Sequence, residues 1–331
     1  MRSLEQVDPA VLANGSRTLW VIIAAMAAAV VLGYWATGLA VDVLSNTALL
    51  GSFPVLGSIV WVYRSVRPDE HLASAMETAT QLLLVLLFGI VLSYAAAAVA
   101  LPYRDAELYA IDQWLGFDRR AYLDFVARQE LGTACGIIYL TMQPQLALVP
   151  LALVLARQPA HLQQFVVAFA IALVVTIAVF VFVPAVGAFV HADLTPEAYA
   201  RLPATVYTPA RTLDALRSGL LQSVSLNDLE GLIAFPSFHT AAGLLYVWAL
   251  WPIRLLRWPA ATVNCAMIAT TPLGGAHYVI DLLAGAVVAV VAMSAARRLC
   301  GDERSVRPAR QCRSAGAASP SPFRARPFSK A

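Results

Sequence analysis

The chain has 331 residues, of which 60% are hydrophobic and only 13% are charged. An ordinary soluble domain has about 25% charged residues, so this composition excludes a typical soluble protein and indicates a surface that faces lipid. The formal net charge is +3 and Lys330 is the only lysine, which argues against a nucleic-acid partner. The 4 cysteines show no Cys-x-x-Cys spacing, so the sequence indicates neither a disulfide framework nor a metal site, and we expect no metal or other cofactor.

The apolar residues gather into stretches that predict membrane-spanning helices. A helix needs roughly 20 apolar residues to cross a bilayer core about 30 Å thick, and about eight stretches approach that length. They lie near residues 19–40, 47–63, 78–101, 133–155, 165–190, 236–251, 258–274 and 277–299. We therefore expect an all-α, multi-pass protein of the cell membrane, either inner or plasma membrane.

Arginine is concentrated in the short segments at alternate ends of these spans. By the positive-inside rule, this bias places both termini in the cytoplasm and the long segments 102–132 and 191–235 outside it. We divide the chain into an N-terminal segment, 1–74, with two extra helices, a helical core, 75–300, whose last six spans form one bundle, and a basic cytoplasmic tail, 301–331. The tail is rich in Arg, Ser, Pro and Ala, a composition that predicts disorder.

The first extracytoplasmic segment reads as two short amphipathic helices interrupted at Gly116. Asp118 is a suitable N-cap for the second of them, residues 119–128. The pair is either a lid over a functional site or an inert interfacial element. Tyr278, at the start of the last span, is expected to be an interfacial aromatic anchor.

The run Pro236-Ser237-Phe238-His239 opens the sixth predicted span. Proline suits the first turn of a helix, so Ser237 and His239 are expected within that turn. The free amides and the positive dipole end of a helix N-terminus attract anions such as phosphate, and the serine hydroxyl adds a donor.

The last predicted span begins with His277, and Asp281 follows four residues later. This spacing places both side chains on one face of a helix. A carboxylate on one imidazole nitrogen fixes the tautomer and leaves the other nitrogen free to act as a nucleophile or base. The arginine pattern brings this pair and His239 to the same membrane face, where we expect the two rings within about 10 Å of each other, as in-line chemistry on one group requires.

These residues resemble the type 2 phosphatidic acid phosphatase superfamily of metal-independent lipid phosphatases and phosphotransferases. The central Pro-Ser-Gly-His motif of that family is similar to Pro236–His239, and its last motif, His-x-x-x-Asp, to His277 and Asp281, followed here by Gly285. Phe238, Gly231, the run 275–278 and the segments 115–118 and 139–145 look similar to the inositol phosphorylceramide synthase branch, which are inositolphosphotransferases, and its bacterial relatives. The resemblance covers roughly residues 75–300.

The resemblance implies that His277 attacks phosphorus to form a phosphohistidine, that Asp281 orients it and that His239 protonates the leaving oxygen. The substrate would be a lipid phosphate or phospholipid in the surrounding membrane, and water or an alcohol would accept the phosphoryl group.

The sequence departs from the family at its phosphate-binding cations. A Lys with Arg-Pro is absent, and Thr270 and Thr271 stand where the family has Ser-Arg. The replacement cations are expected in the outer segment, with Arg217 first, Arg211 second and Arg201 third. They would bind the substrate phosphate together with Ser237.

Two other interpretations stay open. Many-spanning proteins with intramembrane ionisable groups include transporters, although charges are scarce in these spans and no internal repeat is visible. The missing cations also fit a relative that has lost catalysis and acts as a scaffold.

Overall fold

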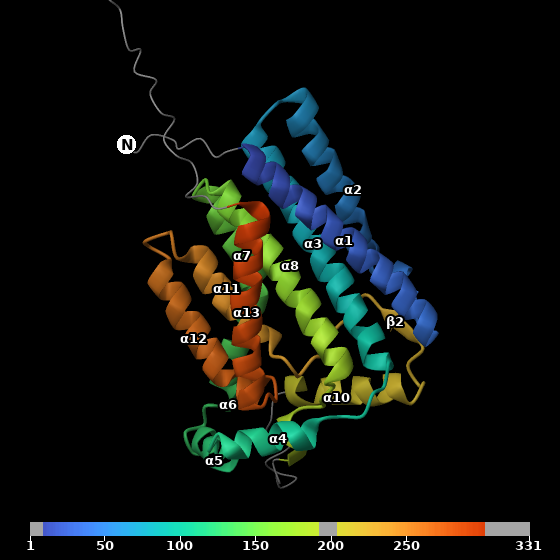
Figure 1. Ribbon diagram of the computed structural model, residues 1–331, viewed down its shortest axis with the longest axis vertical. Coiled ribbons are helices and arrows are strands. Elements are labelled where there is room, and N and C mark those ends of the chain that lie inside the picture. Colours follow the sequence, from blue (N-terminus) through green and yellow to red (C-terminus); the bar gives the residue numbers. More distant parts are fainter. Residues whose placement is uncertain (1–8, 192–203, 302–331) are drawn as a thin grey trace, which may run out of the picture.

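The computed structural model describes residues 9–191 and 204–301, and these are arranged mainly as helices. Long helices lie side by side in a bundle, and short helices cross one end of it (Figure 1). The predicted disordered tail and Arg201 lie outside the described residues. The expected all-α membrane architecture is confirmed.

Helix α8 (Pro159–Phe182) is the centre of the bundle. It packs against five other helices and most of its side chains are buried, because every face of it meets a neighbour. Those neighbours are α1 (Pro9–Thr37), α3 (Glu70–Ala98), α7 (Met142–Leu155), α11 (Phe238–Leu250) and α13 (Val279–Cys300).

Helix α2 (Thr47–Trp61) lies at the outside of the bundle and packs on α3 (Figure 1). Asn46 caps its first turn by accepting a hydrogen bond from the Leu49 amide, and a short π-helical turn, η2 (Val62–Val66), ends it. None of its residues is buried, although the segment is apolar. An apolar helix of this kind is stable where lipid covers it.

Six segments of the described chain are long and apolar enough to cross a membrane: Val11–Thr37, Val43–Val66, Glu70–Ala98, Gly132–Leu155, Pro159–Phe182 and Val279–Cys300. The other two expected spans are helices as well. They are α11, with 13 residues, and α12 (Arg257–Gly274), with 18. The expected span 133–155 consists of two helices, α6 (Gly132–Tyr139) and α7, which are separated at Leu140 and Thr141.

The short elements gather at one end of the bundle. They are α4 (Asp105–Trp114), α5 (Arg119–Arg128), the 3₁₀ turn η3 (Ala188–His191) and α10 (Ala204–Arg217) (Figure 1). The predicted break between α4 and α5 is confirmed: Gly116 has φ +75°, and the Asp118 carboxylate accepts a hydrogen bond from the Ala121 amide at 2.9 Å.

A small parallel sheet joins distant parts of the chain at this end. Strand β1 (Ala40–Asp42) pairs with β2 (Ser223–Ser225), and a 3₁₀ turn, η1 (Val43–Asn46), follows β1. Runs of three residues carry too little alternation to signal a strand, so the sequence did not predict it. The pairing ties the end of α1 to the segment that leads into α11.

Candidate active site

His277 and Asp281 are in contact at the start of α13, with His277 Nδ1 3.2 Å from Asp281 Oδ2. The sequence analysis expected this contact because it placed both side chains on one face of a helix. That prediction is wrong, because the two residues do not share a helix face. The helix begins at Val279, so His277 precedes it, and Asp281 reaches back from the first turn to accept a hydrogen bond from the Tyr278 amide at 2.9 Å. With Nδ1–H donated to the carboxylate, the lone pair of His277 lies on Nε2.

His239 lies in the first turn of α11, as expected, but the helix begins later than the sequence suggested. Pro236 follows a cis peptide bond and precedes the helix, and Ser237 is the N-cap. The Ser237 hydroxyl accepts hydrogen bonds from the amide and the hydroxyl of Thr240, at 3.3 and 3.2 Å. Its own proton therefore remains available for another acceptor.

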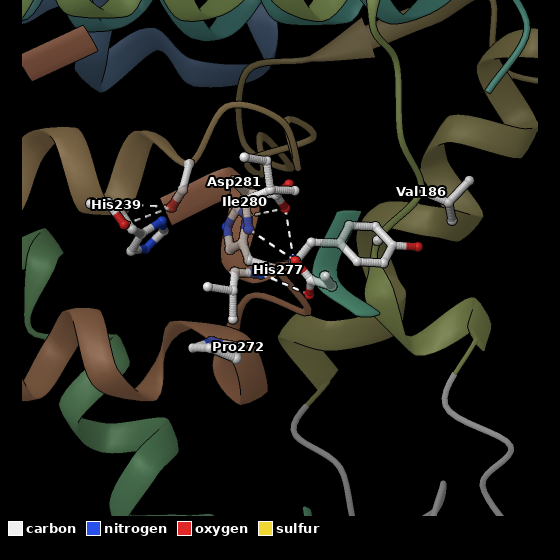
Figure 2. Close-up of polar contacts among 12 residues, drawn as sticks. Val186, His239, Pro272, His277, Ile280 and Asp281 are labelled. Carbon is white, nitrogen blue, oxygen red and sulfur yellow. Dashed lines mark hydrogen bonds and ion pairs between the residues drawn. The ribbon is translucent and has the colours of Figure 1, made fainter. Parts of the chain in front are cut away.

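The two imidazole rings lie side by side, with centroids 6.4 Å apart and planes inclined by 58° (Figure 2). This spacing is within the limit expected from the sequence. Backbone contact between the two helices supports it: the Ser237 amide donates to the Asp281 carbonyl at 3.0 Å, and a β-carbon on Gly285 would collide with the Ser237 carbonyl oxygen. Only glycine at 285 allows so close an approach.

Tyr139 packs on His239 and is a site residue to which the sequence gave no role. Its ring lies 4.1 Å from the imidazole, centroid to centroid and nearly parallel, and its hydroxyl oxygen is 3.2 Å from His239 Nδ1. A β-carbon on Gly275 would lie 2.7 Å from that oxygen and 2.9 Å from His277 Nε2. The tyrosine hydroxyl and the free nitrogen of His277 therefore border the same small volume.

The site is enclosed by protein. His277 is 2% exposed, Asp281 and Ser237 are fully buried, and His239 is partly exposed. Asp281 Oδ1 is buried and has no hydrogen-bond partner among the described residues. An unpaired carboxylate oxygen is costly to bury, which is typical of a group that takes part in chemistry rather than in packing.

Two charged residues beside His277 were not identified from the sequence. Arg119, only 8% exposed, donates hydrogen bonds to the carbonyls of His277 at 2.7 Å and of Pro272 at 3.3 Å, and Asp112, 3% exposed, is 3.8 Å from its guanidinium. Burial lowers the pKa of Arg119, and the neighbouring Asp112 opposes that shift. The sequence carries no signal for them, because charged residues on short amphipathic helices are ordinarily expected to meet solvent.

The position of Tyr278 also differs from the one expected from the sequence. It is fully buried, and its hydroxyl donates to Asp105 Oδ1 at 3.1 Å, so the interpretation as an interfacial anchor is wrong. The aromatic pattern suggested an interface, but the carboxylate on α4 supplies the polar partner that a buried tyrosine needs.

The two candidate phosphate-binding arginines within the described residues both lie on α10, which packs against α3 and α12. The Arg217 guanidinium stacks on the ring of Tyr103, 3.7 Å from its centroid. Burial lowers the pKa of Arg217, and the coulombic effect of Tyr103 opposes this shift. Arg211 is exposed. The contact described for Arg217 is therefore with an aromatic ring and not with either histidine.

The described residues contain no group of three or more His, Cys, Asp or Glu side chains arranged to hold a metal ion. The site contains the His277 imidazole in contact with the Asp281 carboxylate, and the His239 imidazole, whose ring centroid is 6.4 Å from that of His277. The Tyr139 hydroxyl lies beside both rings. Such a set can provide a nucleophile and a proton donor on two sides of one substrate group.

Comparison with known proteins agrees with this chemistry. A family model described as the PAP2 superfamily matches residues 106–295, more than half of the chain, and this match includes both histidines and Asp281. No curated protein and no solved structure gave a significant match. The chain therefore belongs to the PAP2 superfamily, whose members are phosphatases and phosphotransferases.

Proposed function

We propose that the protein is a lipid phosphatase or phosphotransferase that works through a phosphohistidine on His277. The observation that carries the proposal is the geometry of the two imidazoles, 6.4 Å apart with Asp281 behind one of them. His277 Nε2 forms a bond to phosphorus while the bond from phosphorus to the leaving oxygen breaks, and His239 gives that oxygen its proton.

The second half of the reaction reverses these roles. Water or an alcohol loses a proton to His239 and attacks phosphorus, and the bond from phosphorus to His277 breaks. Water as acceptor gives a hydrolase and an alcohol gives a transferase. Ser237, Arg217 and Arg211 are the donors proposed for the phosphoryl oxygens, whose developing charge requires fixed hydrogen bonds.

The positions of arginine relative to the site support an extracytoplasmic active site. Helix α8 has 24 residues, which gives a length of about 36 Å. Arg157 precedes this helix, and the segment that follows its other end meets the site through a hydrogen bond from Ala188 N to Ala276 O. In the same way, Arg297 ends the helix that begins beside His277. Arg157 and Arg297 thus lie at the end of the bundle opposite the site, where the positive-inside rule expects basic residues if that end is cytoplasmic.

The test is a substrate panel on the purified full-length protein in detergent micelles. Lipid phosphates and phospholipids carrying a ³²P label are supplied with and without a candidate alcohol. Release of inorganic phosphate marks hydrolysis, and a new labelled lipid marks transfer. We expect acid-labile label on the protein after a short incubation, and none in His277→Gln.

The outcomes separate the alternatives. Label that persists in His277→Gln places the nucleophile elsewhere and overturns the proposal. Absence of both turnover and label with every substrate class supports the non-catalytic scaffold instead, for which the missing family cations are the motivating observation.

A further inference from the structure

We infer that α4 and α5 form a fixed clamp that positions His277, and that Asp112 and Arg119 are positioning residues for the proposed reaction. The inference rests on the proposed function, since it assigns these residues a role only if His277 is the nucleophile. It replaces the interpretation of α4 and α5 as a lid or an inert interfacial pair.

The first contact of the clamp is made by Asp112. Its two carboxylate oxygens accept hydrogen bonds from the amides of Val279 and Ile280, at 2.9 and 3.0 Å. These amides belong to the first two residues of α13 and have no acceptor within their own helix. A carboxylate here also meets the positive end of the helix dipole. Asp112 therefore fixes the helix start that directly follows His277.

The second contact is made by Arg119, the first residue of α5. Its guanidinium donates to the carbonyls of Pro272 and His277 and so holds together the two ends of the turn between α12 and α13. Its planar group is also 3.8 Å from Asp112. Both charges are almost fully buried, and a buried pair is stable only when hydrogen bonds compensate for the lost water, as they do here.

The third contact is made by Asp105, at the other end of α4. It accepts hydrogen bonds from the Tyr278 hydroxyl at 3.1 Å and from the amides of Val186 and Gly187 at 2.9 and 3.0 Å. The segment that carries these two amides also donates from Ala188 N to the carbonyl of Ala276 at 2.6 Å. The residues on both sides of His277 are thus fixed from two directions.

This arrangement has a chemical consequence. The hydrogen bonds restrain the backbone of His277, while Asp281 orients its ring. The main remaining freedom of His277 is then rotation of its imidazole ring about the side-chain bonds. The contact with the Asp281 carboxylate restricts that rotation. A nucleophile held in this way reaches phosphorus in one orientation, and a displacement of about 1 Å can cost a factor of about 100 in rate.

The test compares Asp112→Asn and Arg119→Lys with a matched control, Glu107→Gln. Glu107 is on the same helix, but it is exposed and pairs with Arg104. Asparagine retains one acceptor oxygen, so one of the two amides loses its partner. Lysine keeps the charge of Arg119 but cannot reach both carbonyls in one plane.

We expect kcat to fall about 10- to 100-fold in both variants, with KM changed by less than about threefold, because the defect lies in the orientation of the nucleophile and not in substrate binding. Hydrogen exchange followed by mass spectrometry should become faster in the peptide that begins at His277, with the rest of the bundle unchanged. Glu107→Gln should match the wild type in both measurements.

Wild-type kcat in both variants overturns the inference. Faster exchange throughout the bundle overturns it as well, because that result assigns Asp112 and Arg119 to global stability alone. The exchange measurement needs no substrate. A result in which His277→Gln remains active, while exchange at α13 responds as expected, therefore rejects the proposed function and leaves the clamp as a structural contact only.

Discussion

His239 lies in the first turn of α11 and His277 directly before α13, and the centroids of their imidazole rings lie 6.4 Å apart at one end of the bundle. The relationship depends on backbone as much as on side chains. The Ser237 amide donates to the Asp281 carbonyl, and Gly285 leaves room for the Ser237 carbonyl against α13. Because the spacing of the rings is set by the contact of two helix starts, small changes at that contact should change the chemistry. The same contact explains why residues near the rings are small or are buried donors and acceptors.

The first prediction concerns the hydroxyl of Tyr139. Tyr139→Phe keeps the ring that stacks on His239 and removes only the oxygen 3.2 Å from Nδ1. We expect a fall in kcat of about three- to tenfold for an alkyl phosphate, the size of one lost hydrogen bond. With 4-nitrophenyl phosphate the fall should disappear, since a good leaving group needs no proton from His239.

Two comparisons make this prediction specific. His239→Gln should show the same dependence on the leaving group with a larger loss. Tyr246→Phe removes a hydroxyl that donates to the Met142 carbonyl, in the same bundle but away from the histidines, and should behave as the wild type. An equal loss of Tyr139→Phe activity with both substrates would mean that the hydroxyl supports structure and not proton transfer.

Much of the helical arrangement could be predicted from the sequence, because membrane spans are long apolar runs. In lipid, each span must form the hydrogen bonds of its own backbone groups internally, and a helix does so. The break at Gly116 and the cap at Asp118 were also predictable, since both are local signals. The short strands were not, because three paired residues have no periodicity of their own. The expected start of α11 at Pro236 is too early, because Ser237 is the N-cap and the helix begins at Phe238.

The candidate site was only partly accessible. His239, His277 and Asp281 could be named because each lies at a recognisable helix start. Arg119 and Asp112 could not be identified in this way. Their partners are backbone amides and carbonyls far along the chain, and every residue type carries such groups, so the sequence does not show which residues they contact. Tyr139 gave no signal for the same reason: an aromatic residue in an apolar helix is indistinguishable from a core residue until its neighbour is known.

The second prediction ranks the arginines of α10. Arg217 is partly buried with its guanidinium on Tyr103, whereas Arg211 is exposed. Water screens a partly buried guanidinium less than an exposed one, so Arg217→Ala should raise KM for a lipid phosphate more than Arg211→Ala does. We expect about a tenfold rise against about a twofold rise, measured by initial rates in mixed micelles. The opposite ranking would assign Arg211 as the principal phosphate ligand.

The third prediction is a pH effect on the docking of α5. Burial raises the pKa of Tyr122 to about 12, and its hydroxyl donates to the Ala269 carbonyl at 3.2 Å. A folded-state pKa above the usual 10.0 means that the stabilising contribution is complete below pH 10 and is lost as the pH rises toward 12. The protection of the α5 peptide, that is, its exchange rate relative to the base-catalysed rate of an unstructured peptide at the same pH, should therefore fall across that range.

Tyr122→Phe is the control for this effect. The variant has no hydroxyl to ionise, so its loss of protection between pH 10 and 12 should be much smaller, with slightly lower protection at neutral pH from the lost hydrogen bond. An identical alkaline response in the variant would show that another group controls it.

The fourth prediction concerns Gly275, the residue between the two ring systems. In Gly275→Ala, the new methyl group would lie 2.5 Å from His277 Cδ2 and 2.7 Å from the Tyr139 oxygen, closer than such atoms can approach. Overpacking of this kind costs about 1–3 kcal/mol of stability, and it should also lower the rate, because the methyl group must displace one of the two rings. A shift of about 1 Å predicts a loss of about 100-fold in kcat.

Gly57→Ala is the matched control, since a β-carbon there meets nothing within 4 Å. Both variants should insert into membranes and elute as the wild type does in size-exclusion chromatography. Full activity of Gly275→Ala would mean that the rings can separate without loss of function, and the close placement of His239, Tyr139 and His277 would then have no catalytic importance.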